Sequence, residues 1–107
     1  MDSVSEIRSC EDMGKVDRMN QSTELLVITM EECGELIQAC SKVLRIASDK
    51  NSDKKKIAQA IYKLRMEAAD VQAMINIMVE KELIDRKELG SMAVDKRKKL
   101  RKYSNIF

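Results

Sequence analysis

The sequence predicts an all-α protein, and its composition supports this prediction in three ways. Proline is absent and only three of the 107 residues are glycine, so the residues that break helices and form tight turns are scarce. Aromatic residues make up 3% of the chain, too few for the aromatic and β-branched runs typical of strands. A chain of this length is expected to form one domain, residues 1–107, whose modest core would be stabilised by oligomerisation.

The first half of the chain contains signals for two helices. Ser3 and Glu6 have the spacing of a capping box, so a first, polar helix is expected to begin there and to end around residues 17–21. A second helix is expected over residues 22–47. The segment 48–53 has no apolar residue and is rich in cap and turn formers, which predicts a polar loop.

The second half is expected to form two more helices. One spans about residues 54–81 and is followed by a short break at 82–85. Asp85-Arg86-Lys87-Glu88 resembles a second capping box and predicts a helix that continues to about Tyr103.

The apolar residues of the two long helices follow helical periodicity. The helix over 22–47 has one apolar face, which contains Glu32, with Glu35 at its edge. The helix over 54–81 has two apolar stripes, and Glu67 and Asp70 lie between them. A helix that is apolar on two sides usually packs against two partners, so one partner is expected to be another subunit.

The charge balance and the absence of histidine exclude several functions. Without histidine, Ser–His and Cys–His nucleophiles and His-ligated zinc or iron sites are not available. The net charge of +2, from 20 basic and 18 acidic residues, argues against a dedicated nucleic-acid-binding protein. The basic residues do gather at 93–107, but three aromatic residues provide few stacking platforms for bases.

Cysteine usage and hydropathy bear on the compartment. Cys10, Cys33 and Cys40 are an odd number without a Cys-x-x-Cys motif, and free cysteines of this kind are usually small core residues. The chain shows no signal peptide and no apolar run of membrane-spanning length. A cytoplasmic protein without membrane association is therefore expected.

Two acidic motifs are the main candidates for a functional site. Glu31-Glu32-Cys33-Gly34-Glu35 and Glu67-Ala68-Ala69-Asp70 each place carboxylates three residues apart, on one face of a helix. If the two helices are antiparallel neighbours, four negative charges meet, and a hard divalent cation such as Mg²⁺ would compensate them. The alternative is that these acids are solvated or paired with surface cations, as in many charge-rich helices.

The sequence contexts of both motifs resemble the MazG-like, all-α nucleoside triphosphate pyrophosphatase superfamily. The resemblance rests on Ile28-Thr29-Met30-Glu31-Glu32-Cys33-Gly34-Glu35-Leu36 and Glu67-Ala68-Ala69-Asp70-Val71, and it spans about residues 21–102. The 31 residues between Glu35 and Glu67 slightly exceed the family's usual gap, and the extra length fits in the polar loop at 48–56. The resemblance implies an antiparallel, four-helix-bundle-like MazG fold completed by oligomerisation, as a homodimer or homotetramer.

The resemblance also implies a reaction and roles for individual residues. The reaction would be Mg²⁺-dependent hydrolysis of a nucleoside triphosphate between the α and β phosphates, with Mn²⁺ as a substitute metal. The implied metal ligands are Glu32, Glu35, Glu67 and Asp70. Glu31 or Glu35 would accept a proton from water. The substrate would be bound by Lys96, Lys99, Arg101 and Gln21.

A non-catalytic helical interaction module is the alternative function. In that case the acids would be surface charges, and the Lys/Arg-rich end of the last helix would be a solvated face that interacts favourably with its own dipole. Metal dependence separates the two hypotheses.

Overall fold

A computed structural model gives the fold and describes residues 20–107. This part of the chain consists of three helices, α3 (Gln21–Ser48), α4 (Lys54–Glu80) and α5 (Arg86–Tyr103), and has no strand. The all-α prediction is therefore confirmed, with helix ends close to those expected from the sequence. The helix predicted within residues 1–20 lies outside the described residues.

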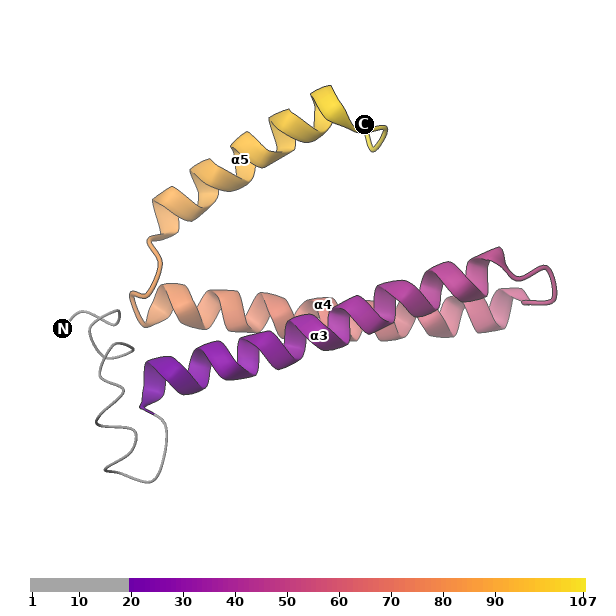
Figure 1. The fold of residues 1–107 in the computed structure, drawn as a ribbon, viewed down its shortest axis with the longest axis horizontal. Helices are drawn as coiled ribbons and strands as arrows, with labels where there is room; N and C mark the ends of the chain where they lie inside the picture. The colour runs from indigo at the N-terminus through magenta and orange to yellow at the C-terminus, as the bar shows by residue number, and fades with distance from the viewer. Residues whose placement is uncertain (1–19) are drawn as a thin grey trace.

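Helices α3 and α4 form a long antiparallel hairpin (Figure 1). Asn20 caps the start of α3, where its side chain accepts a hydrogen bond of 2.9 Å from the Thr23 backbone N–H. Asp53 caps α4 in the same way, accepting from the Lys56 N–H at 2.8 Å. Between the helices, the Asp49 side chain accepts a 2.9 Å bond from the Asn51 N–H, so the predicted polar loop is a tight connection built by its own side chains.

The chain leaves α4 through a Schellman motif. The Leu83 N–H donates to the Met78 carbonyl at 2.9 Å and the Glu82 N–H donates to the Val79 carbonyl at 3.0 Å. Glu82 has a φ of 62°, the left-handed conformation that glycine usually provides at this position. Asp85 then caps α5 by accepting from the Glu88 N–H at 2.9 Å, as the capping-box pattern predicts.

The contact between α3 and α4 forms a thin core. Leu25, Ala39 and Ala60 are the buried apolar side chains of the described residues, and none of the large ones is completely buried. The apolar face expected on α3 is therefore only partly covered: Leu44 is 71% exposed, and Cys40, expected in the core, is exposed as well. The reason is that, within residues 20–107, α3 and α4 have each other as their main packing neighbour.

Helix α5 contributes little to this core. It turns away from the hairpin (Figure 1) and has no buried residue. The radius of gyration is 18.2 Å, whereas a compact chain of this length has about 13 Å. The accessible surface is 8893 Å², against about 6,000 Å² for a compact monomer of this mass. Among the described residues, no helix combines the length and apolarity needed to span a membrane.

Candidate metal centre

The hairpin brings the two acidic motifs together. Glu32 and Glu35 of α3 meet Glu67 and Asp70 of α4, and one carboxylate oxygen from each lies within 4.8 Å of the others. This arrangement follows from the sequence: acids three residues apart point from one helix face, and the antiparallel pairing of α3 with α4 places the two faces opposite each other. The convergence predicted from the motifs is present.

Glu67 is the most deeply placed member of the cluster. It is 3% exposed, and its Oε1 pairs with Lys63 Nζ at 2.7 Å, one helical turn away on α4. Lys63 lowers the pKa of the Glu67 carboxyl, and contact with Glu35 acts in the same direction. Glu67 is therefore held as a carboxylate, with one oxygen committed to Lys63 and the other directed elsewhere.

For the acids on α3, the pKa is shifted in the opposite direction. Partial burial and the charges of Asp70 and Glu67 raise the pKa of Glu32. The pKa of Glu35 is also raised, first by its contact with the Glu67 carboxyl and then by the Glu67 and Glu32 charges. Both shifts mean that an additional positive charge at this point would be favourable.

Two oxygens of the cluster lack any hydrogen-bond partner. Of the three buried side-chain oxygens that are unpaired in residues 20–107, two are Glu32 Oε2 and Glu67 Oε2. An unpaired buried carboxylate oxygen is costly, and such orphaned groups are uncommon in folded proteins. A metal ion bound by these oxygens would remove that cost.

The donor set fits a hard divalent cation. All four ligands are carboxylate oxygens, the type that Mg²⁺ and Mn²⁺ prefer. Opposite ligands of an Mg²⁺ ion lie about 4.2 Å apart, twice the usual coordination distance. The 4.8 Å span of the cluster is thus close to what one ion needs, and a small inward shift of the exposed Glu35 and Asp70 side chains would close the difference.

The other predicted site residues lie at different places. Glu31 is exposed beside the cluster, and its charge contributes to the raised pKa of Glu32. Gln21 begins α3, roughly 16 Å along the helix axis from Glu32. Helix α5 has few contacts with the hairpin. Its predicted substrate-binding cations are exposed and are not brought to the acids within this chain: Lys96, Lys99 and Arg101.

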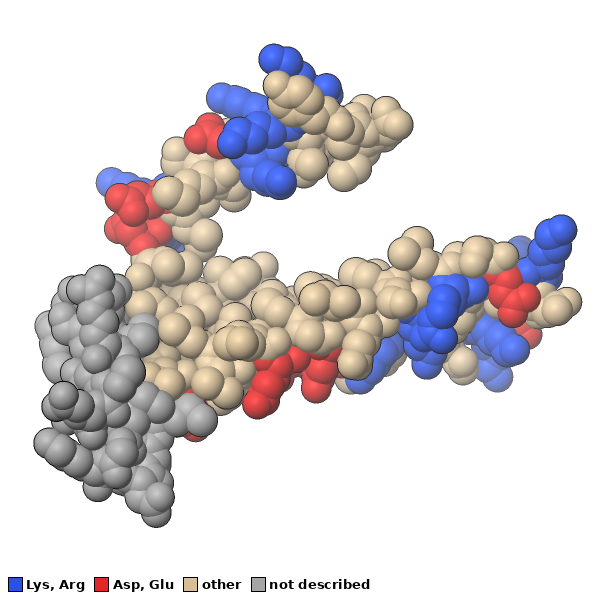
Figure 2. Space-filling model, in the orientation of Figure 1, with Lys and Arg blue, Asp and Glu red and all other residues tan. Residues whose placement is uncertain are grey.

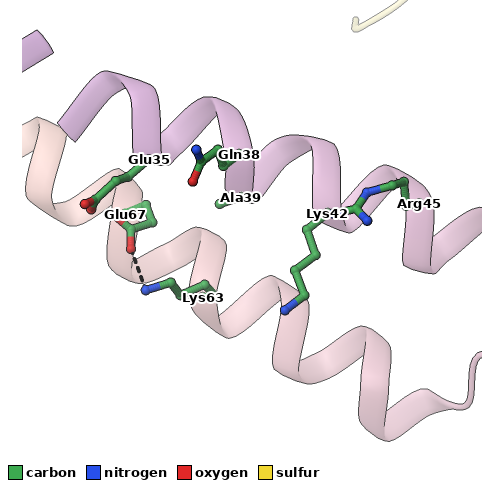
Figure 3. A pocket seen from close by; sticks show the side chains of 7 residues that line it. All are labelled: Glu35, Gln38, Ala39, Lys42, Arg45, Lys63 and Glu67. Carbon is green, nitrogen blue, oxygen red and sulfur yellow. Dashed lines mark ion pairs between the residues drawn. The ribbon is translucent and has the colours of Figure 1, made fainter. Parts of the chain in front are cut away.

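Three cations near the cluster were missed by sequence reasoning. A groove of about 450 Å³ adjoins the acids on the side of the loop and is lined by Glu35, Gln38, Ala39, Lys42, Arg45, Lys63 and Glu67 (Figure 3). Lys63 was identifiable from its position four residues before Glu67, the spacing of a helical ion pair. Lys42 lies two helical turns beyond Glu35 on α3, a weaker signal in a chain so rich in lysine.

Comparison of the chain with protein-family models, with curated protein sequences and with solved structures gave no match.

Proposed function

We propose that this chain is an Mg²⁺-dependent nucleotide pyrophosphohydrolase of the MazG-like type. The observation that supports the proposal best is the acidic cluster, because four carboxylates from two helices converge and two buried oxygens lack partners. Such a set is unfavourable on its own and becomes favourable around a cation that also binds a polyphosphate.

In the proposed reaction, water is added across the bond between the α and β phosphates. The products are a nucleoside monophosphate, pyrophosphate and a proton. A bound metal ion would neutralise phosphate charge and lower the pKa of water. Glu32, Glu67 and Asp70 would hold the ion. Glu35 would share in binding it, and either Glu35 or the exposed Glu31 would take the proton from the attacking water.

The proposal includes completion of the fold by a second copy of the chain. Helix α5 buries none of its residues, and Met92 and Val94 on it are 66% and 53% exposed. On α4, Met66 is 45% exposed. Pairing of two hairpins would cover this surface, produce a four-helix arrangement and bring α5 of one subunit near another subunit's acids. A homodimer or a homotetramer satisfies these requirements.

The test is a pyrophosphate-release assay with canonical and modified nucleoside triphosphates, with Mg²⁺ and with Mn²⁺. We expect metal-dependent release from at least one substrate, and loss of it in Glu35→Gln and in Asp70→Asn. Lys99→Ala should raise KM or lower kcat without changing metal affinity. Release that persists in both acid variants, or none from any substrate, would refute the proposal.

The exposed apolar side chains of α5, Met92 and Val94, support one alternative, a non-catalytic interaction module. In that case Mg²⁺ would not alter thermal stability, and the acids could be replaced by amides without functional loss. The same metal titrations therefore distinguish the two functions.

A further inference from the structure

The groove beside the acidic cluster has a charge gradient along its length. At one end are Glu35 and Glu67, and at the other are Lys42 and Arg45, with Lys63 between them (Figure 3). Figure 2 shows acidic side chains midway along the hairpin, and toward its loop it shows mainly basic side chains together with a few acidic ones. A ligand lying along this groove would contact the acids, and any metal on them, at one end and the cations at the other.

The cations at the loop end are available for a ligand. The structure records no ion pair between Lys42 or Arg45 and any other residue in the part of the chain that it describes. Figure 3 shows Lys42 reaching from α3 toward α4, and the Arg45 side chain extending back along α3 toward Lys42. Between them and the acids, Ala39 is buried and small, which keeps this stretch of the groove open.

Lys63 connects the two ends. Its ammonium pairs with Glu67 Oε1, while Glu67 Oε2 has no hydrogen-bond partner. The Glu67 carboxylate can therefore face a metal ion with Oε2 while Oε1 keeps the Lys63 ammonium at the edge of the groove. A phosphate bound to that ion would lie next to Lys63.

The spacing suits a chain of linked phosphates. Lys42 and Arg45 follow Glu35 by seven and ten residues, which corresponds to roughly 10 and 15 Å along α3. In Figure 3 the Arg45 side chain extends back toward Lys42, which shortens its distance from the acids, whereas Lys42 reaches across toward α4. Lysine provides a point charge and arginine a fork that binds phosphate oxygens through two hydrogen bonds, so the pair is chemically suited to terminal phosphates.

We propose that Lys42, Arg45 and Lys63 bind the β and γ phosphates of the substrate, and thus the departing pyrophosphate, in this groove. The inference rests on the function proposed above. The pyrophosphate is then bound by cations of the same hairpin that carries the acids. The nucleoside extends from the acids in the direction away from the loop at residues 49–53. The α5 cations Lys96 and Lys99 then have at most a secondary role in holding pyrophosphate.

The experiment measures binding, without turnover, in two titrations. Mn²⁺ alone is titrated by electron paramagnetic resonance, and inorganic pyrophosphate is titrated by calorimetry in the presence of Mg²⁺. The groove variant is Lys42→Ala with Arg45→Ala. The matched control is Arg86→Ala with Lys87→Ala, which removes one arginine and one lysine from the exposed start of α5. Lys96→Ala with Lys99→Ala tests the competing cations.

We expect the groove variant to weaken pyrophosphate binding by about tenfold or more while leaving Mn²⁺ binding unchanged, because it loses two charge-assisted contacts. The control variant and the α5 variant should each change the pyrophosphate affinity by less than about threefold. The exchange Lys42→Arg with Arg45→Lys keeps both charges and should retain most of the affinity.

Three results would overturn the inference. If the groove variant and the control bind pyrophosphate with equal affinity, the groove is not the pyrophosphate site. The same conclusion follows if only the α5 variant loses pyrophosphate affinity. Wild-type protein that binds Mn²⁺ but not pyrophosphate excludes the groove as well, while leaving the metal site intact. Absence of Mn²⁺ binding in the wild type instead refutes the proposed function itself.

Discussion

At the scale of single residues, the acidic cluster costs stability in the absence of a cation. Glu32 and Glu35 have raised pKa values, so their folded state favours the protonated form. Their stabilising contribution is present below the ordinary value of 4.5 and is lost as pH rises through the raised values. Glu67 behaves oppositely: its pKa is lowered, so its contribution is present above 4.5 and is lost as pH falls through the lowered value.

Removing one charge should therefore stabilise the metal-free protein. At pH 7 we expect Glu35→Gln to have a higher thermal midpoint than wild type without metal, because the repulsion among the acids falls. Mg²⁺ at about 100 times its dissociation constant should add about 2.7 kcal/mol to the wild type and much less to the variant. Differential scanning fluorimetry measures both effects. Glu24→Gln, an exposed acid outside the cluster, should respond to Mg²⁺ like wild type. An equal response in Glu35→Gln would contradict this account.

Metal affinity should rise with pH. The pKa values of Glu32 and Glu35 are raised from 4.5, so protons compete with a metal ion for these two carboxylates up to a higher pH than for an ordinary glutamate. The Mg²⁺ affinity measured by calorimetry should increase with pH until both raised values are passed, and binding should release protons to the buffer. Glu67, whose pKa is lowered by Lys63, adds no dependence in this range. Affinity that is constant from pH 4.5 to 7 would show that the acids are not the ligands.

The sequence predicted the acids of this site but not its cations. Glu32, Glu35, Glu67 and Asp70 were identifiable because acids inside apolar helix faces need a physical explanation. Lys42 and Arg45 were not, because an exposed lysine or arginine on a charged helix has no local feature that separates a ligand-binding group from a solvated one. Their position became visible only when the hairpin placed them along the same groove as Glu35.

At the scale of elements, helix boundaries were predictable because they depend on neighbouring residues. Asp85 begins a helix as its capping-box pattern requires, and the apolar-free segment 48–53 contains the hairpin loop. The Schellman turn at Glu82 was expected only as a break, because the position lacks the glycine that usually marks such a turn.

That turn leads to a stability prediction. Glu82→Gly should stabilise the protein by about 1 kcal/mol, because glycine adopts a positive φ without the steric cost that a side chain incurs. Urea denaturation at constant protein concentration measures the change. Glu80→Gly, at the last residue of α4, should instead destabilise by up to about 1 kcal/mol, because it introduces glycine into helical backbone. Destabilisation by Glu82→Gly would show that its side chain contributes more than the strain costs.

At the scale of the whole molecule, the position of α5 was not predictable from this chain alone. Periodicity shows which residues of a helix are apolar, but not which partner covers them. The described helices leave Met92, Val94 and Ile37 largely exposed. A second copy is the partner we propose.

Self-association should therefore depend on Met92, an apolar side chain of α5 that is 66% exposed. In sedimentation experiments we expect a dimer or tetramer, with a thermal midpoint that rises with protein concentration. Met92→Asp should shift the protein toward monomer and remove that concentration dependence, because it places a charge in the contact. Ser91→Asp, the same new charge at the adjacent exposed polar position, should leave the assembly intact. A wild-type monomer at all concentrations would contradict the proposal.

The most direct test of the metal centre is anomalous diffraction from a crystal grown with Mn²⁺. Our account predicts a strong anomalous peak surrounded by carboxylate oxygens of Glu32, Glu35, Glu67 and Asp70, with Lys63 still paired to Glu67. A well-ordered cluster without such a peak, in crystals containing millimolar Mn²⁺, would contradict the assignment and the enzymatic function built on it.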